Sequence, residues 1–314
     1  NHAQAYDIVF DSEDNVIDSH QPKSRFRVFL GDDRRAKFRE LLEKTGCHMR
    51  AEDDGKIHIF KPARNTSTAW EANTAYSLRN VVIPTTANNY VYICTSAGTS
   101  HATTEPTWPT GIGDTVADGT VAWAVAYDYE YELNADGQHT FFTKSYREQL
   151  VFPNKVTVKS FENDDPSTRT GSATSSSDNS LMAIEQTIRA TLASNDEATN
   201  IAEAVIARYE MWADSGGAEV PMNVGAEVLD FVHIIDSRNG DNRNGNIGEL
   251  TLYYTSPTNG RGRWSMTFSF GNWTTVDGIL GRLGITPTEL QEYFSRLLVD
   301  NLHAERLTST QIEA

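Results

Sequence analysis

Residues 66–127 read TSTAWEANTAYSLRNVVIPTTANNYVYICTSAGTSHATTEPTWPTGIGDTVADGTVAWAVAY. The stretch holds three of the six tryptophans and thirteen threonines, but no lysine and only five charged residues. The segments on either side of it are rich in charge. A composition shift with two sharp borders predicts an inserted module that folds independently. Because insertions are tolerated where a host chain exposes a loop, module and host can be interpreted separately.

The module is expected to be a small all-β unit. β-branched and aromatic residues predict short strands at 81–83, 90–94 and 121–125. Asn88-Asn89 and Asp118-Gly119 favour turns between them.

The aromatic side chains of the module are the candidate binding residues. Exposed Trp and Tyr rings stack on the apolar faces of sugars. Trp108 lies in a proline-bounded loop that cannot bury it easily, and Tyr76 and Tyr92 are expected to flank it. The predicted glycan site is therefore Tyr76, Tyr92 and Trp108. The alternative is that so small a module needs nearly every aromatic ring for its own core, a role that suits Trp70 and Trp123.

The host chain shows helix signals at three places. A helix over 34–44 follows Asp32-Asp33 and ends at Gly46. A capping box of Ser194 and Glu197 opens a helix that runs to about Ala213. Gly216-Gly217 is expected to end the region of this second helix. The third helix is expected at the C-terminus and begins near Thr286-Pro287.

The remaining host segments predict strands and loops. Asp54-Gly55 between two alternating runs predicts a hairpin of 48–51 and 56–60. Other strands are expected at 6–10, 26–30, 129–133, 140–143, 156–160, 220–222, 228–235, 249–254 and 264–270, with loops at 162–180 and 237–248.

These patterns predict an α+β fold, mainly β, with β-barrel-like host domains and packed helices. The expected first host domain comprises 1–65 together with 128–150, and the inserted module comprises 66–127. The expected second host domain, 151–272, is a β-barrel with one helix, and a helical segment, 273–314, follows it. Excising the module joins the 56–60 strand almost directly to the 129–133 strand, which favours insertion within one host domain. Asn1 in place of Met suggests a fragment or a processed start. Two alternatives stay open for residues 1–30, which either begin a domain or finish a truncated one.

Charge and composition argue against several classes of partner. The net charge of −16 disfavours nucleic acid and anionic membrane surfaces. No apolar run approaches the roughly 18–20 residues that span a bilayer. Cys47 and Cys94 lie on opposite sides of the module border and do not form the pattern of a disulfide scaffold, although a bond between them is possible.

The sequence predicts no metal site, no cofactor and no catalytic residues. His48 and His58 can face each other across the predicted hairpin, but no third ligand is near in sequence. The oxygen-rich loop 237–248 has Ca²⁺-like ligands, yet Arg243 takes the place of one, and a hairpin loop is preferred. No nucleophile elbow, phosphate loop, zinc-protease helix or Cys–His pattern is present, so the chain is not expected to be an enzyme.

The module resembles small chitin-binding-like modules with the pattern W-x5-Y…V…Y-x-A/C…P…W, in Trp70–Tyr76, Val81, Tyr90–Cys94 and Glu105–Pro109. Its closing Asp118–Trp123 resembles a version common in bacteriophage tail and fibre proteins. The module departs from the enzyme-linked chitin binders around Arg79-Asn80, where a glycine is usual, and lacks the tryptophan usual after the Tyr-x-Cys strand.

The host resembles phage tail hub and baseplate hub proteins, in Asp33–Ala36, Leu41–Cys47, Asp54–Ile59, Leu150–Val158, Pro221–Asn223, Glu227–Val232 and Asp236–Arg238. The resemblance implies β-barrel domains that assemble as trimers below the tail tube and bind tube, tape-measure and fibre proteins. It places the chain in the virion, at the tail tip.

We therefore expect a structural virion protein, a homotrimeric baseplate hub subunit that joins the tail tube to the distal tip and fibres. Its module is expected to bind host-surface polysaccharide. The first alternative is a carbohydrate-binding adhesin or receptor-binding protein for which the host is only a scaffold. The second is a cell-wall polysaccharide hydrolase.

Overall fold

A computed structural model of the chain describes residues 7–271 apart from 12–15, 18, 22–25, 134–138, 149–150, 162–167, 176–183, 239 and 257–261. These residues belong to one compact unit that extends to residue 272. Strands predominate and two helices are described, so the mainly β class is confirmed. Neither described helix is both long and apolar enough to cross a bilayer. The expected helical segment 273–314 lies outside the described residues.

The first sheet contains the predicted hairpin. It has the order β1 (Ile8–Phe10), β3 (Ile57–Phe60), β2 (His48–Ala51), and α1 (Arg34–Leu42) precedes β2. Gly55 makes the turn with a φ of 78°, a backbone conformation that favours glycine. Residues 26–30 form no strand, contrary to expectation.

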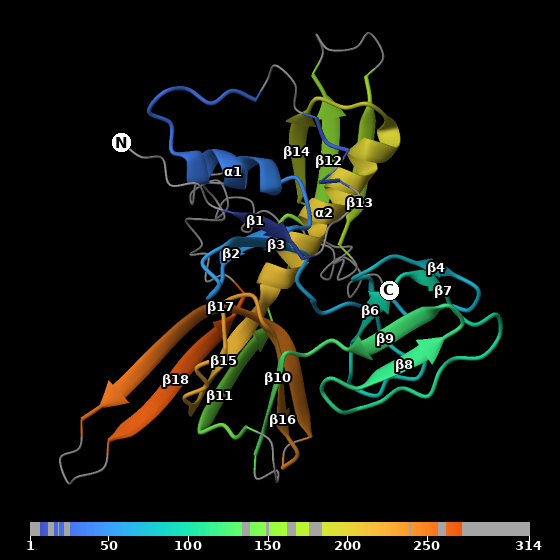
Figure 1. Cartoon of the computed structure of the whole chain (residues 1–314). Helices are drawn as coiled ribbons and strands as arrows, with labels where there is room; N and C mark the ends of the chain where they lie inside the picture. The colour runs from blue at the N-terminus through green and yellow to red at the C-terminus, as the bar shows by residue number, and fades with distance from the viewer. Residues whose placement is uncertain are drawn as a thin grey trace, which may run out of the picture. The chain divides into compact units, whose positions relative to one another are not determined.

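The module is built from six short strands in two small sheets (Figure 1). One sheet pairs β4 (Ala75–Tyr76) with β7 (Gly98–Thr99). The other has the order β5 (Val81–Val82), β6 (Tyr92–Ser96), β9 (Val121–Val125), β8 (Thr115–Asp118). The predicted Asp118-Gly119 turn joins β8 to β9, with Gly119 at a φ of 62°.

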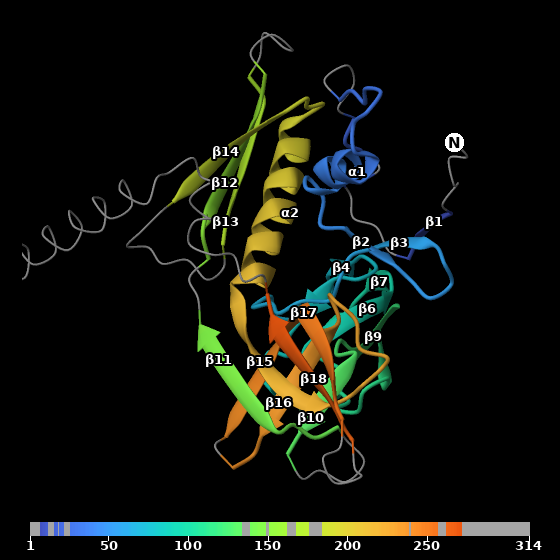
Figure 2. The same ribbon diagram turned by 90° about the vertical axis from the view of Figure 1, so that its left-hand side faces the viewer.

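A six-stranded sheet forms the largest part of the host and curls into half a barrel (Figures 1 and 2). Its order is β10 (Tyr129–Glu132), β16 (Phe231–Asp236), β17 (Asp241–Thr255), β18 (Arg263–Phe270), β15 (Asp214–Pro221), β11 (Thr143–Glu148).

Strand β17 belongs to both halves of this sheet. Residues 241–246 pair with β16, and residues 247–255 pair with β18. The register shifts between Ile247 and Glu249, next to Gly248, where an added Cβ would meet the carbonyl oxygen of Gly271 at 1.4 Å. Only glycine fits at this bend.

Two expectations about the large sheet were wrong. Most of the loop expected at 237–248 is strand, because β17 begins at Asp241. Gly216 and Gly217 do not end a region but pair inside β15. Strands β10 and β11 pair with β16 and β15, so the large sheet includes residues from both sides of position 150.

The third sheet packs on the long helix (Figure 2). It has the order β13 (Thr170–Thr174), β12 (Lys155–Ser160), β14 (Glu185–Ala190), covered by α2 (Asn195–Ala213). Strand β13 lies inside the segment expected to be a loop. The predicted cap is confirmed, because the Glu197 amide donates to Ser194 Oγ at 3.0 Å. Gly171 lets the helix approach, since a Cβ there would lie 2.3 Å from the Thr199 nitrogen.

Arg208 ties the long helix to the first sheet. Its guanidinium is buried and donates to the Leu42 oxygen at 2.6 Å, the Thr45 oxygen at 2.7 Å and the Cys47 oxygen. Leu42 is the last residue of α1, and Thr45 and Cys47 lie in the turn that leads from α1 to β2. One side chain of α2 therefore donates to three carbonyls of this turn.

Replacing Arg208 by Ala is expected to lower the free energy of unfolding by about 3 kcal/mol or more, because a buried acceptor left without a donor costs about 1–3 kcal/mol. Urea unfolding followed by circular dichroism measures it. The control is Arg39→Ala on the exposed face of α1, where the change should stay within about 1 kcal/mol. Equal stability of the two variants would contradict this role of Arg208.

Candidate functional site

The three residues predicted to bind glycan lie together, but against the core of the module. Tyr92 is 0% exposed and belongs to that core. Its hydroxyl donates to the Pro109 oxygen at 2.7 Å. Trp108 packs on Tyr92 with ring centroids 4.3 Å apart, and Tyr76 meets Trp123 edge-on at 4.8 Å. Trp108 and Tyr76 remain half-buried, so only parts of these two rings reach the surface.

A buried carboxylate organises these aromatic rings. Asp118 Oδ2 accepts from the indole nitrogens of Trp70 at 2.7 Å and Trp123 at 3.0 Å. Its Oδ1 accepts from the His101 amide at 2.8 Å. A buried charge is tolerated only when it is well hydrogen-bonded, and three N–H donors meet that condition. From the sequence, Asp118 was interpreted only as a turn residue.

The module does not close its core by itself. Phe231 of the host strand β16 is 0% exposed and belongs to the same cluster of buried side chains as Trp70, Tyr92 and Trp123. The ring of Tyr127, at the end of the module, lies 5.0 Å from that of Phe231. The main chain of Phe231 pairs within the host sheet. Phe231 therefore belongs to the host sheet by its main chain and to the module core by its side chain.

Next to Phe231, a buried polar network joins module and host. His233 is fully buried, and its Nδ1 lies 2.9 Å from Glu130 Oε2, while its Nε2 contacts Asn242 Oδ1. The His233 ring stacks on Tyr127 at 4.4 Å.

Two tyrosines of the module extend this network. The Tyr90 hydroxyl donates to Glu130 Oε2 at 3.4 Å, and burial followed by the charge of Glu130 raises the pKa of Tyr90 to about 12. Asn244 Nδ2 donates to the Tyr127 hydroxyl at 3.0 Å. Sequence reasoning missed this network because its members are separated by about a hundred positions and belong to no motif.

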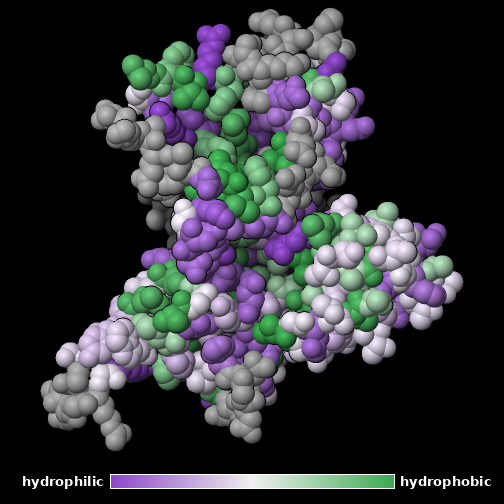
Figure 3. All heavy atoms as spheres, in the orientation of Figure 1, coloured by the Kyte–Doolittle hydropathy of each residue, from purple (hydrophilic) through white to green (hydrophobic). Residues whose placement is uncertain are grey.

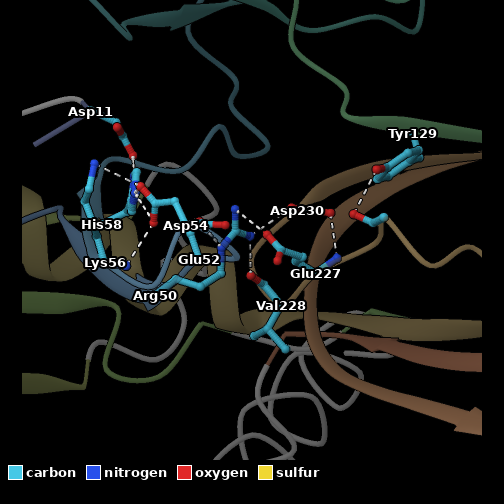
Figure 4. Close-up of polar contacts among 11 residues, drawn as sticks. Asp11, Arg50, Glu52, Asp54, Lys56, His58, Tyr129, Glu227, Val228 and Asp230 are labelled. Atoms are coloured by element: carbon cyan, nitrogen blue, oxygen red, sulfur yellow. Dashed lines mark hydrogen bonds and ion pairs between the residues drawn. The ribbon is translucent and has the colours of Figure 1, made fainter. Parts of the chain in front are cut away.

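Arg50 forms a second link, between β2 and the segment before β16 (Figure 4). Its guanidinium lies 2.7 Å from Glu52 and 2.9 Å from Glu227. It also lies 3.0 Å from Asp230 and donates to the Val228 oxygen at 2.9 Å. Burial raises the pKa of Asp230, and Arg50 opposes that shift. The first sheet is therefore attached to the large sheet by a charged contact.

The residues considered for metal binding have other partners. In the hairpin, His48 is opposite Phe60 and His58 is opposite Arg50, so the two histidines do not face each other. Asp236 and Asp241 share Lys144, and hydrogen bonds from Arg238 and Lys144 lower the pKa of Asp236 to about 2. Among the described residues, no three His, Cys, Asp or Glu side chains are placed to hold a metal ion.

Cys47 and Cys94 are both free thiols.

His58 of β3 lies between the carboxylates of Asp11 and Asp54. Asp11 directly follows β1, so titration of His58 tests a side-chain contact between the neighbouring strands β1 and β3. Its Nδ1 lies 2.8 Å from Asp11 Oδ2, and this hydrogen bond raises the pKa of His58 above 6.5. The fold favours the protonated ring, so this stabilisation is complete below the unfolded pKa and is lost as pH rises through the folded pKa. Asp11→Asn is expected to lower the His58 pKa in an NMR titration, whereas Asp53→Asn should leave it unchanged. A native His58 pKa at or below 6.5 would contradict the contact.

Comparisons with known proteins give only distant likenesses. No family model and no curated protein matches the chain. Three solved structures described as tail proteins align with 78–89% of it and are similar at low identity: the 43 kDa tail protein of prophage MuSo2 from Shewanella oneidensis (10% identity, TM-score 0.39), a tail protein from Neisseria meningitidis MC58 (9%, 0.44), and prophage tail protein gp18 from Listeria monocytogenes EGD-e (9%, 0.34). The aligned part is 54%, 60% and 64% of those chains, respectively. At TM-scores below 0.5, these likenesses carry no argument about what the chain does.

Proposed function

We propose that this chain is a structural protein of a phage tail: a baseplate hub subunit at the tail tip that assembles as a homotrimer and joins the tail tube to the distal tip and fibres. The hub-like motifs of the host and the tail-associated version of the module support this role. The proposal includes no catalytic step, so turnover of labelled peptidoglycan or chitin by the purified chain would contradict it and favour the hydrolase.

The observation that carries the proposal is an arm formed by residues 251–255 of β17 and 263–265 of β18, which projects beyond the rest of the large sheet (Figure 1). Leu252 is opposite the buried Met266, and Tyr254 is opposite Trp264. Because side chains alternate along a strand, Leu252, Tyr254 and Trp264 lie on the face that forms the core further down the sheet. They are 51%, 54% and 57% exposed.

This arm continues an apolar core face into solvent. Tyr254 and Trp264 pack on each other with ring centroids 4.4 Å apart and planes inclined by 37°, so the two rings form one continuous aromatic surface. Clustered large apolar side chains on a surface mark a contact site for another protein. A stable interface needs about 800 Å² from each partner, which is more than three side chains supply. The arm is therefore proposed as the apolar centre of a larger subunit contact.

Polar substitution of the arm is expected to dissociate the assembly. The wild-type chain should be trimeric by light scattering coupled to size-exclusion chromatography, and the variant Leu252→Ser, Tyr254→Ser, Trp264→Ser should be monomeric. Tyr253→Ser is the matched control, because Tyr253 is 49% exposed on the opposite face of the same strand. A monomeric wild-type protein at high concentration, or a trimeric triple variant, would contradict the proposal.

We also propose glycan binding by the surface parts of Trp108 and Tyr76, which is the role expected of an adhesin. The exposed surface of the module is mostly pale in Figure 3, neither strongly hydrophilic nor hydrophobic, as its threonine-rich and charge-poor sequence implies. Rings set in such a surface can stack on sugars. The Trp108 indole nitrogen donates to Glu105 Oε1 at 2.8 Å, which holds the ring in its orientation.

Trp108→Ala in the full chain is expected to abolish retention on chitin, and Trp108→Phe should keep part of it because an aromatic ring remains. Tyr253→Ala, outside the module and on the face of the arm that is not proposed as a subunit contact, is the control and should be retained like the wild type. Near-UV circular dichroism verifies that each variant is folded. Wild-type retention by folded Trp108→Ala would show that Trp108 is not the stacking residue.

A further inference from the structure

A cavity of about 240 Å³ lies where the module meets the large sheet. The module side contributes the turn Asn88-Asn89 and Tyr90, and the host side contributes three consecutive residues of β17, Asn242–Asn244. Tyr146 of β11 and Asn65, just before the module, also line the cavity. Two of the lining residues contact the buried Tyr127–His233 stack, Asn244 through the Tyr127 hydroxyl and Asn242 through His233. The position of this wall of the cavity is therefore fixed by buried side chains.

Asparagine amides dominate the lining of this cavity. They come from both sides: Asn65, Asn88, Asn89, Asn242 and Asn244. An amide offers two N–H donors and a carbonyl acceptor, and a sugar hydroxyl both donates and accepts. A set of convergent amides therefore matches a ligand with several hydroxyl groups.

Two of these amides are held in place from behind. Asn244 uses its Nδ2 on the Tyr127 hydroxyl, and Asn242 uses its Oδ1 on His233. Among the described residues, neither Asn244 Oδ1 nor Asn242 Nδ2 has a hydrogen-bond partner. One acceptor and one donor are thus fixed in orientation and left for a ligand, which lowers the entropy cost of binding.

Of the remaining three, Asn88 is engaged within the module, because its Nδ2 donates to the Tyr92 hydroxyl and its Oδ1 accepts from the Tyr90 amide. The other two are presented at the opening. Asn65 and Asn89 are exposed, and no hydrogen bond joins either side chain to another described residue. Asn89 has a φ of 68°, in the left-handed region that asparagine adopts more readily than most residues. The backbone of the turn therefore sets the direction of the Asn89 side chain.

The charge of the lining indicates a neutral ligand. No carboxylate or lysine lines the cavity, and its one charged residue is Arg243. The Arg243 guanidinium is already paired with Asp241 at 2.7 Å and lies 4.1 Å over the ring of Tyr146. Tyr90 and Tyr146 add aromatic surface of the kind on which sugar rings pack. The volume is below the roughly 300–1,000 Å³ of pockets for drug-sized ligands, which suits a single sugar ring.

We propose that this junction cavity binds one residue of a neutral saccharide through the amides of Asn65, Asn89, Asn242 and Asn244. The proposal does not depend on the structural role in a tail, and it places sugar binding at a different position from Trp108. Because module and host each supply half of the cavity, neither could form it alone.

The test uses the full chain and a panel of neutral oligosaccharides (chitotetraose, cellotetraose, maltotetraose and mannotetraose), with binding measured by calorimetry. At least one should bind the wild type, and Asn65→Ala with Asn89→Gly should weaken its binding at least tenfold. Both changes remove amides that support no other described side chain, and glycine keeps the φ of residue 89. Asn73→Gly is the matched control, an exposed module asparagine with a φ of 50°, and should bind as the wild type.

Three results would overturn the proposal: no panel member binds at millimolar concentration, the Asn65→Ala, Asn89→Gly variant binds like the wild type, or Asn73→Gly loses as much affinity as that variant. Loss of binding in folded Trp108→Ala with full binding in Asn65→Ala, Asn89→Gly would assign the sugar to the aromatic surface instead. The oligomeric state of each variant, measured separately, keeps this test independent of the tail proposal.

Discussion

The position of Phe231 is the constraint on which module and host both depend. Its amide donates to Asp128 Oδ2 and its carbonyl accepts from the Asp128 amide, both at 2.8 Å, so the chain leaving the module is fastened to β16. The side chain fills the module core while the main chain pairs with Asn246 of β17. The module is an insertion in sequence, but physically its core is completed by the host. Its orientation is therefore set by packing rather than by a flexible linker.

This junction determines what the surfaces around it can do. His233 and Tyr127 fill the space behind the cavity, and their hydrogen bonds fix Asn242 and Asn244 at its wall. The same strand, β17, carries amides at one end and exposed apolar side chains at the other. A rigid junction would let a sugar bound at the module be held at a fixed distance from the arm proposed to contact other subunits.

The sequence predicted well where structure depends on neighbouring residues. The Ser194 cap, the Asp54-Gly55 hairpin and the Asp118-Gly119 turn were all found, because caps and tight turns are local. It failed where distant partners override local preference. Asn242, Asn244 and Asn246 looked like a loop, yet each amide has a partner elsewhere, as Asn246 has in the Ala63 oxygen at 2.6 Å. The surroundings of Tyr92 are also decided by a residue distant in sequence, because its hydroxyl donates to the Pro109 oxygen.

By itself, the sequence predicted the β character of the module and several of the aromatic residues that fill its core, since composition and turn chemistry are readable along the chain. Only the tertiary structure decided which aromatic rings are buried, that Asp118 holds two indoles, and that β10 joins the large sheet instead of the first. These outcomes depend on contacts between residues that are far apart in sequence. Their free energy comes from burial and hydrogen bonding that exist only once the chain has closed on itself.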